Sequence, residues 1–575
     1  MIDWITQIIL QIDIVFLLVL FFSEKENPSR ILLWAIVMIF LPLVGLILYL
    51  VVGQTFYSEH KFKRKGLKDD EIDNIVPDGR DIIAAESDPD YRRTAGAILN
   101  AGGLGYSNNN DVKLYTLGED KFRDLYDDLR NAKRYIHLEY YIIRDDELGN
   151  ELMDILIAKI GEGVEVKLLT DDFGVGKGPK KAIRRFKAAG GEFAVFHKVV
   201  WLLFSPKKNN RNHRKIGIID GKIAYCGGFN IGDEYLGKGP FGYWRDTAVR
   251  ITGGAVKPIQ VRFQMDWEYA TKRPMCPKDR MQDYYGVEPE KTGTNRVLTV
   301  SGGPDVADFN PVRLEYLELI RNAKKTVYLH SPYFIPDESL QDALSVAAAN
   351  GVDVRVIIPD KPDHMFVYWC NISSAYQVMG NGVKVYMYNR GFVHSKTMVV
   401  DGRYCSVGSA NFDDRSLVLN FETNAVILSD DFGRQMDEAF MEDLEYCTQY
   451  TREDYDNISG YKALRVAFSR LFSGLSRGHV KGPGIISRVP ATFFFLLGGS
   501  SSKFLHRRDS EILIMASAIS KALRISSTGG SKLSYLVFTQ YPVNLSASQG
   551  ILPIVWNPGT IPEGNRCRAP FVGYS

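Results

Sequence analysis

The sequence predicts an α/β protein in which two similar halves follow an apolar N-terminus. The stretches "NHRKIGIIDGKIAYCGGFN" and "VHSKTMVVDGRYCSVGSAN" match at seven positions with a fixed offset of 181, six of them identical and one a basic residue in both. Upstream of each stretch the pattern strand, helix, strand recurs with short loops, which is typical of a parallel βαβ unit. Near the N-terminus, 22 uncharged residues are long enough to cross a bilayer as a helix.

Composition restricts the function classes. The 575 residues provide about three to four domains. A formal net charge of +2 argues against a dedicated nucleic-acid binder, and we expect no nucleic-acid partner. None of the six cysteines forms a C-x-x-C pair or stands at zinc-ligand spacing from a histidine, so we expect no structural metal.

Residues 1–58 are predicted to form a membrane anchor of two hydrophobic helices. The run 31–52 would span about 33 Å as a helix, against a hydrocarbon core of about 30 Å. The run 5–22 contains Asp13, and a flat interfacial or re-entrant segment is the alternative there.

A basic juxtamembrane linker is predicted for residues 59–109. Its cluster "HKFKRKGLK" follows the second hydrophobic run, and positively charged segments stay in the cytoplasm. We therefore expect a multi-pass protein of the cell membrane with its catalytic domains on the cytoplasmic side. The cluster is either a topology signal only or also attracts anionic headgroups.

The two halves are predicted at 110–290 and 295–473. In the first, "AKRYIHLEYYII" and "VEVKLLTDDFG" are typical of strands and "GNELMDILIAKIGEG" of a helix, and the second repeats this order. Two repeats are too few for a solenoid, so each half should be a full domain with its own sheet. A pseudo-twofold axis between them would bring the two motifs face to face.

Within each motif the histidine and the lysine lie two positions apart, hence on one face of a strand. His213 and Lys215 share that face while Arg214 points away, and His394 and Lys396 repeat the arrangement. A pocket with two imidazoles and two ammonium groups suits a phosphodiester, because the lysines stabilise the charge that develops at phosphorus. The amides of Asn230 and Asn411 are candidates for neutral hydrogen bonds to the phosphate.

The two histidines can divide the chemistry between them. Near neutral pH one neutral imidazole attacks while one imidazolium acts as the acid. We expect His213 to form a phosphohistidine and His394 to protonate the departing alcohol and then deprotonate the incoming one; the reverse assignment is the alternative. Asp246 and Glu422 are candidates to orient the rings through their other nitrogen.

Asp220 and Asp401 complete the motifs, each directly before a glycine. They are candidate catalytic residues, with the organisation of a turn or an ion pair as the alternative. Four further histidines are interpreted as structural, and His330 is the one among them most suited to line the pocket. They are His137, His197, His330 and His364.

These motifs resemble the HKD signatures of the phospholipase D superfamily. The wider pattern, with "WAIVMIFLPLVGLILYLVVG", "WRDT", "HSPYFIPD" and "NFDDRSLVLNFE", is similar to bacterial cardiolipin synthases over about residues 28 to 473. The resemblance implies two tandem phospholipase D-like α/β/α sandwich domains with the active site at their interface. It further implies transfer of a phosphatidyl group between two phosphatidylglycerol molecules, giving cardiolipin and glycerol without metal or cofactor. Membrane phospholipids are then the partners.

Two segments fall outside this pattern. Trp201 to Phe204, followed by Lys207, Lys208 and Arg211, has the composition of a segment that dips into a lipid interface; a buried strand with a polar loop is the alternative. The tail 474–575 is rich in Ser and Gly, and from residue 478 on it has 10 Lys and Arg against 3 Asp and Glu. We interpret the tail as poorly ordered and foreign to the evolved fold, with a regulatory extension as the alternative.

Other functions fit the same motifs less well. A membrane-anchored phospholipase D would pass the phosphatidyl group to water, and no motif separates lipid from water as the acceptor. A nuclease is disfavoured by the slight acidity of residues 1–477, which carry 60 Lys and Arg against 65 Asp and Glu. A non-catalytic membrane scaffold is disfavoured because both motifs are intact.

Overall fold

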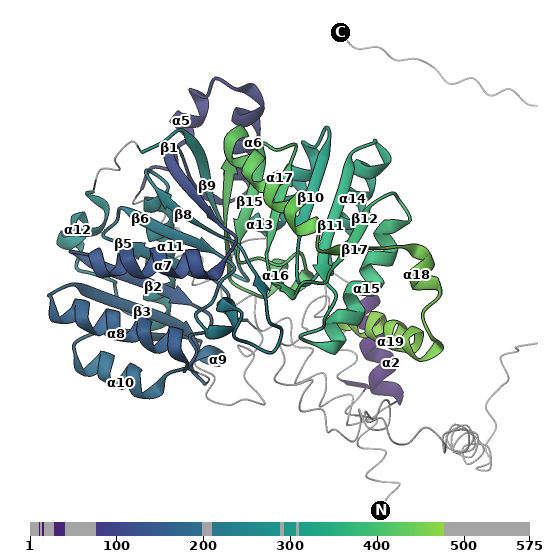
Figure 1. Ribbon diagram of the computed structural model, residues 1–575, viewed down its shortest axis with the longest axis horizontal. Helices are drawn as coiled ribbons and strands as arrows, with labels where there is room; N and C mark the ends of the chain where they lie inside the picture. The colour runs from purple at the N-terminus through teal and green to yellow at the C-terminus, as the bar shows by residue number, and fades with distance from the viewer. Residues whose placement is uncertain are drawn as a thin grey trace, which may run out of the picture. The chain divides into compact units, whose positions relative to one another are not determined.

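The computed structural model describes residues 28–40, 76–176, 178–197, 210–287, 292–305 and 310–476, together with Gln11, Ile14 and Val15. Within these residues, fifteen strands form one mixed sheet (Figure 1). The α/β prediction is confirmed. Both predicted βαβ units are present, because β2 runs parallel to β3 and β10 runs parallel to β11.

The two halves repeat one strand order. From the outer edge inward, the first half has β4 (Glu192–Phe196), β3 (Glu165–Asp171), β2 (Tyr135–Tyr140), β5 (Lys215–Ile219), β6 (Ile223–Gly227), β8 (Ala248–Thr252) and β1 (Gly103–Tyr115). The second half has β12 (Lys384–Tyr388), β11 (Asp353–Pro359), β10 (Thr326–His330), β14 (Thr397–Val400), β15 (Tyr404–Gly408), β16 (Glu422–Leu428) and β9 (Asn295–Gly302), with β17 (Cys447–Tyr450) at its outer edge. Strands β5 and β14, which follow the two histidine motifs, hold the same place in each half.

The prediction of a separate sheet for each half is wrong. Strand β1 is long enough to pair twice: residues up to Asn110 pair with β9 of the second half, and residues from Asp111 pair with β8 of the first. A separate sheet in each half would end in an exposed edge with unpaired backbone groups. The shared strand removes both edges and joins the halves rigidly.

Helices cover both faces of the sheet. One face packs against α7 (Gly118–Asn131), α8 (Glu147–Gly161) and α10 (Lys180–Ala188) in the first half, and against α13 (Pro311–Arg321), α14 (Glu338–Ala349) and α15 (Met365–Met379) in the second. The other face packs against α11 (Val256–Thr271) and α17 (Asp430–Leu444), whose side chains share one apolar core that includes strands of both halves. This common core is a second reason why the halves form one body.

Several further elements are short and lie mainly in the connections. They are η3 (Asp233–Leu236), η4 (Lys278–Arg280), α9 (Asp172–Val175), α12 (Gln282–Tyr285), α16 (Asp414–Val418), α18 (Arg452–Asp456) and a two-stranded sheet of β7 (Trp244–Arg245) and β13 (Phe392–Val393).

The prediction of a linker over 59–109 is wrong from residue 76 onward, where the structure is described. This part forms α5 (Arg80–Ala84), α6 (Pro89–Asn100) and the start of β1. Tyr91 and Ile98 of α6 are buried in the core of the second half, and Glu86 forms a 2.6 Å ion pair with Arg296. The sequence carried a readable signal, because Asp88 caps α6 directly before Pro89.

At the N-terminus, α2 (Pro28–Phe40) is described, and it packs against α19 (Gly460–Ser476) near the C-terminal end of the body (Figure 1). Among the described residues, no helix has the length and apolarity needed to cross a membrane. The rest of the run 31–52, most of 5–22, the cluster "HKFKRKGLK", residues 201–208 and the tail from residue 477 lie outside the described residues.

Candidate active site

Short backbone pairings between the halves position both histidines. The amide of His394 donates to the carbonyl of Arg245 over 2.7 Å, directly after the pairing of β13 with β7. The amide of His213 donates to the carbonyl of Phe421 over 2.9 Å. Asp246 directly follows Arg245, and Glu422 directly follows Phe421. Each backbone hydrogen bond therefore places a histidine beside an acid of the other half.

The imidazole rings use these acids in a crossed arrangement. Nδ1 of His394 lies 2.6 Å from Oδ2 of Asp246, and Nδ1 of His213 lies 3.1 Å from both carboxylate oxygens of Glu422. The carbonyl of Ser409 also lies 3.1 Å from Nδ1 of His213. With Nδ1 donating to these acceptors, Nε2 is the nitrogen of each ring left for chemistry.

Both carboxylates are held in place by further donors. Glu422 accepts from the hydroxyl of Ser409 at 2.6 Å and from the amide of Asn420 at 3.1 Å, and Asp246 accepts from the backbone of Thr247 at 2.8 Å. Burial acts to raise the pKa of both acids, but the neighbouring histidine and lysine charges outweigh it, so each pKa lies below its ordinary value. Both acids are therefore anionic at neutral pH.

The two lysines share the environment of the rings. Nζ of Lys215 donates to the carbonyl of His213, and Nζ of Lys396 donates to the carbonyl of His394. Burial, together with the charge of Lys396, lowers the pKa of Lys215 to about 7. Burial also lowers the pKa of Lys396 to about 8, against the attraction of Asp246 and Glu422.

Burial is likewise the main cause that lowers the pKa of His213 to about 4, and the charges of Lys215 and Lys396 act in the same direction. The pKa of His394 is lowered by burial and by both lysines as well. Each ring thus responds to lysines from both halves. The structure brings His213, Lys215, His394 and Lys396 into one site.

Arg214 points to the opposite side of the motif, as the alternation predicts. It is fully buried, pairs with Asp266 at 2.6 Å and donates to the carbonyls of Gly302 and Glu422. Because these contacts join β5 to β9 and β16, Arg214 fixes the backbone of the acid that holds His213. Asp266 was not predicted, because its position on α11 carries no motif in the sequence.

Asp220 and Asp401 lie elsewhere. Asp220 follows the far end of β5, five residues beyond the start of that strand, which is about 16 Å along it. Its carboxylate accepts from three backbone amides, those of Lys133, Arg134 and Tyr135, and Asp401 repeats the arrangement with residues 324–326. The geometry favours the turn-organising alternative, and we remove both aspartates from the catalytic set.

The two asparagines differ in their surroundings. Asn230 accepts from the amide of Ile142 at 3.3 Å and donates to the hydroxyl of Tyr235 at 2.7 Å. Oδ1 of Asn411 is buried and has no hydrogen-bond partner among the described residues. Phosphate binding by either side chain stays a prediction.

Three other histidines have structural surroundings. His330 is buried between Thr397 at 3.0 Å and Asp443 at 3.2 Å. The ring of His137 contacts the Gln260 side chain at 3.1 Å, and that of His197 contacts the carbonyl of Asn210 at 3.0 Å. Their interpretation as structural residues is supported, and His330 packs in the core with Phe440.

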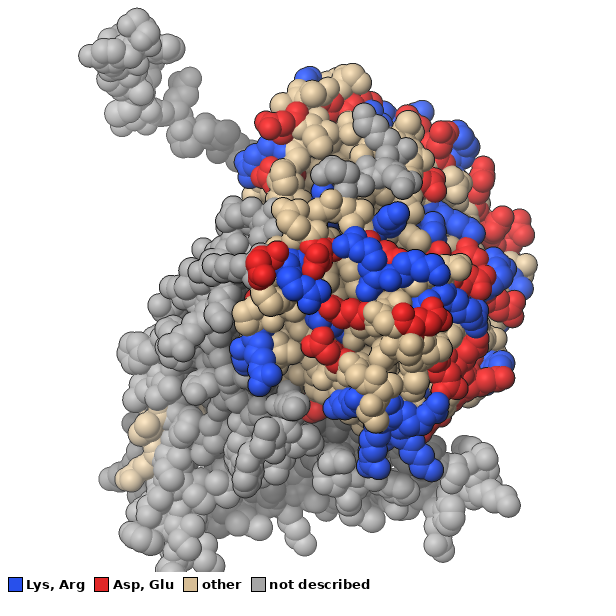
Figure 2. Space-filling view, turned by 90° about the vertical axis from the view of Figure 1, so that its left-hand side faces the viewer, with Lys and Arg blue, Asp and Glu red and all other residues tan. Residues whose placement is uncertain are grey.

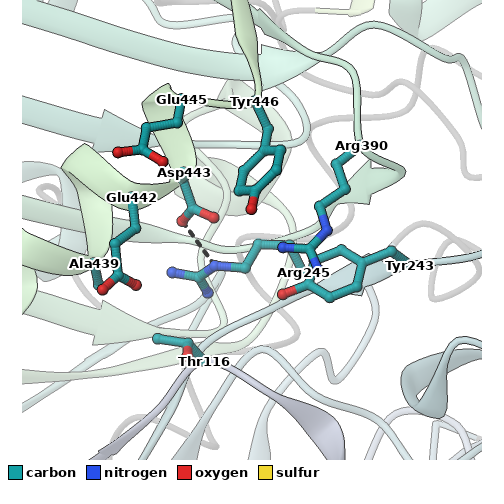
Figure 3. A pocket seen from close by; sticks show the side chains of 9 residues that line it. All are labelled: Thr116, Tyr243, Arg245, Arg390, Ala439, Glu442, Asp443, Glu445 and Tyr446. Atoms are coloured by element: carbon teal, nitrogen blue, oxygen red, sulfur yellow. Dashed lines mark hydrogen bonds and ion pairs between the residues drawn. The ribbon is translucent and has the colours of Figure 1, made fainter.

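A cavity of about 160 Å³ is lined in part by Arg245. The backbone carbonyl of the same residue accepts the hydrogen bond from the amide of His394. Figure 3 shows Arg245 paired with Asp443 at 2.7 Å, and Arg390 against Tyr243 and Tyr446. None of the predicted site residues lines this cavity. In the described part of the chain, no group of three or more His, Cys, Asp or Glu side chains could hold a metal ion, and the expectation of metal-free chemistry stays a prediction.

Two family models match the chain. The model described as "Cardiolipin synthase, PLD-like domain" matches residues 125–267 and 316–444, one segment in each half. The model described as "Phospholipase_D-nuclease N-terminal" matches residues 8–54. The chain belongs to the cardiolipin synthase family.

Curated relatives support the same family. Cardiolipin synthase of Staphylococcus aureus strain Mu50 is 40% identical over 476 residues, which cover 80% of this chain and 94% of that protein. Cardiolipin synthase 2 of Staphylococcus epidermidis strain ATCC 35984 is 39% identical over 472 residues, covering 80% and 96%. The predicted resemblance to bacterial cardiolipin synthases is thereby confirmed, and with it the class of a phosphatidyltransferase.

Solved structures share the fold of this cardiolipin synthase family member. The crystal structure of phosphatidylserine synthase from Haemophilus influenzae aligns with a TM-score of 0.51 at 16% identity, covering 67% of this chain and 97% of that one. Together with the match of each half to the PLD-like domain model, this similarity confirms the phospholipase D-like fold.

Proposed function

We propose that this member of the cardiolipin synthase family moves a phosphatidyl group from one phosphatidylglycerol to another through a phosphohistidine at His213. The crossed pairing of both rings with buried carboxylates carries the proposal. It leaves two Nε2 atoms and two lysines for a phosphodiester. That set provides a nucleophile, an acid and charge compensation without a further group.

In the first step, Nε2 of His213 attacks phosphorus. Its pKa of about 4 keeps the imidazole neutral and nucleophilic at neutral pH. A P–N bond forms, the P–O bond to glycerol breaks, and His394 gives its proton to the departing oxygen. Asp246 at 2.6 Å stabilises the protonated form of His394 that this step needs.

In the second step, the terminal hydroxyl of another phosphatidylglycerol attacks the phosphohistidine. His394 takes the proton of that hydroxyl, the new P–O bond forms and the P–N bond breaks. One phosphodiester is exchanged for another, so the reaction needs no nucleotide. Lys215 and Lys396 offset the negative charge that develops on the phosphoryl oxygens in both steps.

The proposal includes a membrane location. We propose that residues 1–58 anchor the chain through the hydrophobic runs 5–22 and 31–52, with the catalytic body on the cytoplasmic side. The match of residues 8–54 to an N-terminal family model supports a segment that belongs with this body.

A substrate whose leaving group departs without a proton can distinguish the two histidines, because its cleavage needs the nucleophile but not the acid. The full-length protein is incubated in EDTA with labelled phosphatidylglycerol, or with a phosphatidyl ester of p-nitrophenol, and lipid and water-soluble products are followed. We expect His213→Ala to be inactive on both substrates, and His394→Ala to release nitrophenol in one burst with label bound to His213. His364→Ala is the control, because this side chain is 39% exposed.

Each outcome has a distinct meaning. Cardiolipin and glycerol from the unchanged protein support the proposed transfer, whereas phosphatidic acid alone would establish water as the acceptor. A burst from His213→Ala with label on His394 would reverse the assignment of the roles. Absence of any product from the unchanged protein would leave the scaffold alternative.

A further inference from the structure

Helix α10 presents an unusual concentration of positive charge. From residue 177 to residue 191 the sequence has six Lys or Arg and no Asp or Glu, although the chain as a whole has 70 against 68. Ala182 and Phe186 face the core. The other face carries five exposed cations, which we call the α10 surface: Lys180, Lys181, Arg184, Arg185 and Lys187.

These charges are unfavourable for the helix itself. Lys180 and Lys181 stand in the first turn, where the helix dipole disfavours cations, and Pro179 at the N-cap provides no side-chain hydrogen bond. Lys180 and Arg184, and Lys181 and Arg185, are like charges four residues apart, which also destabilises a helix. Of the five cations, Arg185 alone forms an ion pair with a described carboxylate, that of Asp154 at 3.0 Å.

An exposed aromatic side chain stands in α9 (Asp172–Val175), the helix that precedes α10 in the chain. Phe173 of α9 is 39% exposed, and the guanidinium of Arg211 lies 4.4 Å from its ring. Arg211 stands two residues before His213 and pairs with Asp171 at 3.3 Å, at the end of β3. Arg211 thus links Phe173 to the segment of the catalytic histidine, and α10 begins at Lys180, seven residues after Phe173 in the chain.

The figures show the same arrangement. In Figure 1, α9 and α10 lie at the lower end of the first half, the end at which α2 lies in the second. Figure 2 faces the side of the first half, and Lys and Arg side chains gather along its lower edge, at the height of α10 in Figure 1. Exposed cations next to an exposed aromatic ring are typical of surfaces that bind anionic lipid headgroups.

We infer that the α10 surface and Phe173 dock the body on an anionic bilayer and hold the entrance to His213 against it. The occupant is the headgroup layer of anionic phospholipid, chosen because of charge complementarity and because Phe173 contacts Arg211, two residues before His213. That this docking serves catalysis rests on the proposed lipid transfer. Binding of the α10 surface to anionic lipid can be measured without any turnover.

Hydrogen–deuterium exchange of the full-length protein tests the inference without any turnover. The protein is placed in nanodiscs of phosphatidylcholine alone or with phosphatidylglycerol, and the amides of residues 172–190 are followed. We expect slower exchange of this segment in the anionic discs and loss of the difference at high salt. The variant Lys180→Gln/Lys181→Gln/Arg184→Gln/Lys187→Gln should lose the difference at low salt too.

A control variant removes the same number of positive charges from exposed positions outside α10. Arg92, Lys133, Lys325 and Lys361 are exposed, and they too comprise three lysines and one arginine. Their replacement by Gln should leave the protection of α10 intact. In activity assays at low anionic lipid fraction, the α10 variant should need about tenfold more phosphatidylglycerol for half-maximal rate, with kcat unchanged.

Two results would overturn the inference. One is equal exchange of α10 in both kinds of disc, and the other is equal loss of protection in the control variant. Protection of α10 by anionic lipid in a protein without transferase activity would support the docking surface while refuting the proposed function.

Discussion

Nδ1 of His394 and Oδ2 of Asp246 lie 2.6 Å apart, although 148 positions of sequence separate them and they belong to different halves. His213 and Glu422 form the reciprocal pair, at 3.1 Å. Each ring therefore depends on the other half for its orientation. The duplicated motif becomes a working site only when the two halves are registered against each other.

The variant Asp246→Asn tests this dependence. The amide occupies the same volume but cannot stabilise a protonated His394, so we expect kcat to fall on the order of 10²-fold or more with little change in thermal stability. Steady-state kinetics with phosphatidylglycerol measure the effect. Asp128→Asn is the control: this carboxylate pairs with Arg250 at 2.7 Å, away from the rings, and its loss should leave kcat unchanged.

Gly228 is expected to tolerate no side chain. A Cβ at this position would lie 2.0 Å from Oδ1 of Asp246, so Gly228→Ala must displace the acid that holds His394. We predict a loss of kcat comparable to that of Asp246→Asn. Gly161→Ala, with nothing within 4 Å of its added Cβ, should keep full activity and unfold at an equal or slightly higher temperature. Equal kinetics for the two alanine variants would refute the prediction.

Asp220→Ala should affect stability and leave the chemistry intact. The carboxylate accepts from three backbone amides in a turn where Asp220 itself has a φ of 55°. Removing these charge-assisted bonds should lower the free energy of unfolding by about 2–4 kcal/mol, while kcat of the folded protein stays within about threefold. Thermal unfolding and kinetics at low temperature separate the two effects. A folded but inactive Asp220→Ala protein would restore the aspartate to the catalytic set.

The pH dependence of kcat/KM should reflect the lowered pKa values. His213 must be neutral to attack, so activity should fall as the pH drops through about 4, provided the fold persists. On the alkaline side, His394 must be protonated to act as the acid, and its pKa lies below the ordinary 6.5, so activity should begin to fall below that pH. Lys215 and Lys396 must be charged to bind phosphate, so a further fall should follow as the pH rises through about 7 to 8. Lys215→Arg should move the start of this further fall from about 7 to about 8, the pKa of Lys396, because a guanidinium stays protonated. An alkaline limb that remains in place would assign it to another group.

The same lysines affect stability with a definite sign. Because their pKa values are lower in the folded state than the ordinary 10.5, the unfolded chain binds more protons between about pH 7 and 10.5. Their contribution to the free energy of unfolding therefore rises with pH in that window. Lys215→Met should reduce this rise, as measured by the unfolding midpoint at several pH values.

Much of the fold was predictable because it depends on local pattern. The parallel βαβ units of both halves follow from apolar runs, helix periodicity and short loops. The linker prediction failed at α6 although Asp88 and Pro89 form a recognisable helix start, because charged residues alternate there with the apolar ones that face the core.

The residue types of the site were predictable from the sequence, but their positions relative to one another were predictable only in part. The spacing of histidine and lysine, repeated in register, was enough to predict phosphodiester chemistry. The same repetition suggested a catalytic part for Asp220 and Asp401, and the glycine after each was the one sequence feature that indicated a turn instead.

By itself, the sequence determined the duplication, the strands that carry both motifs and the chemical class of the site. These features are set by neighbours along the chain and by side-chain alternation. Only the tertiary structure decided that Asp246 serves His394, that Glu422 serves His213, and that β1 joins the halves into one sheet. Those pairings come from backbone hydrogen bonds between the halves, which exist only after the halves have docked.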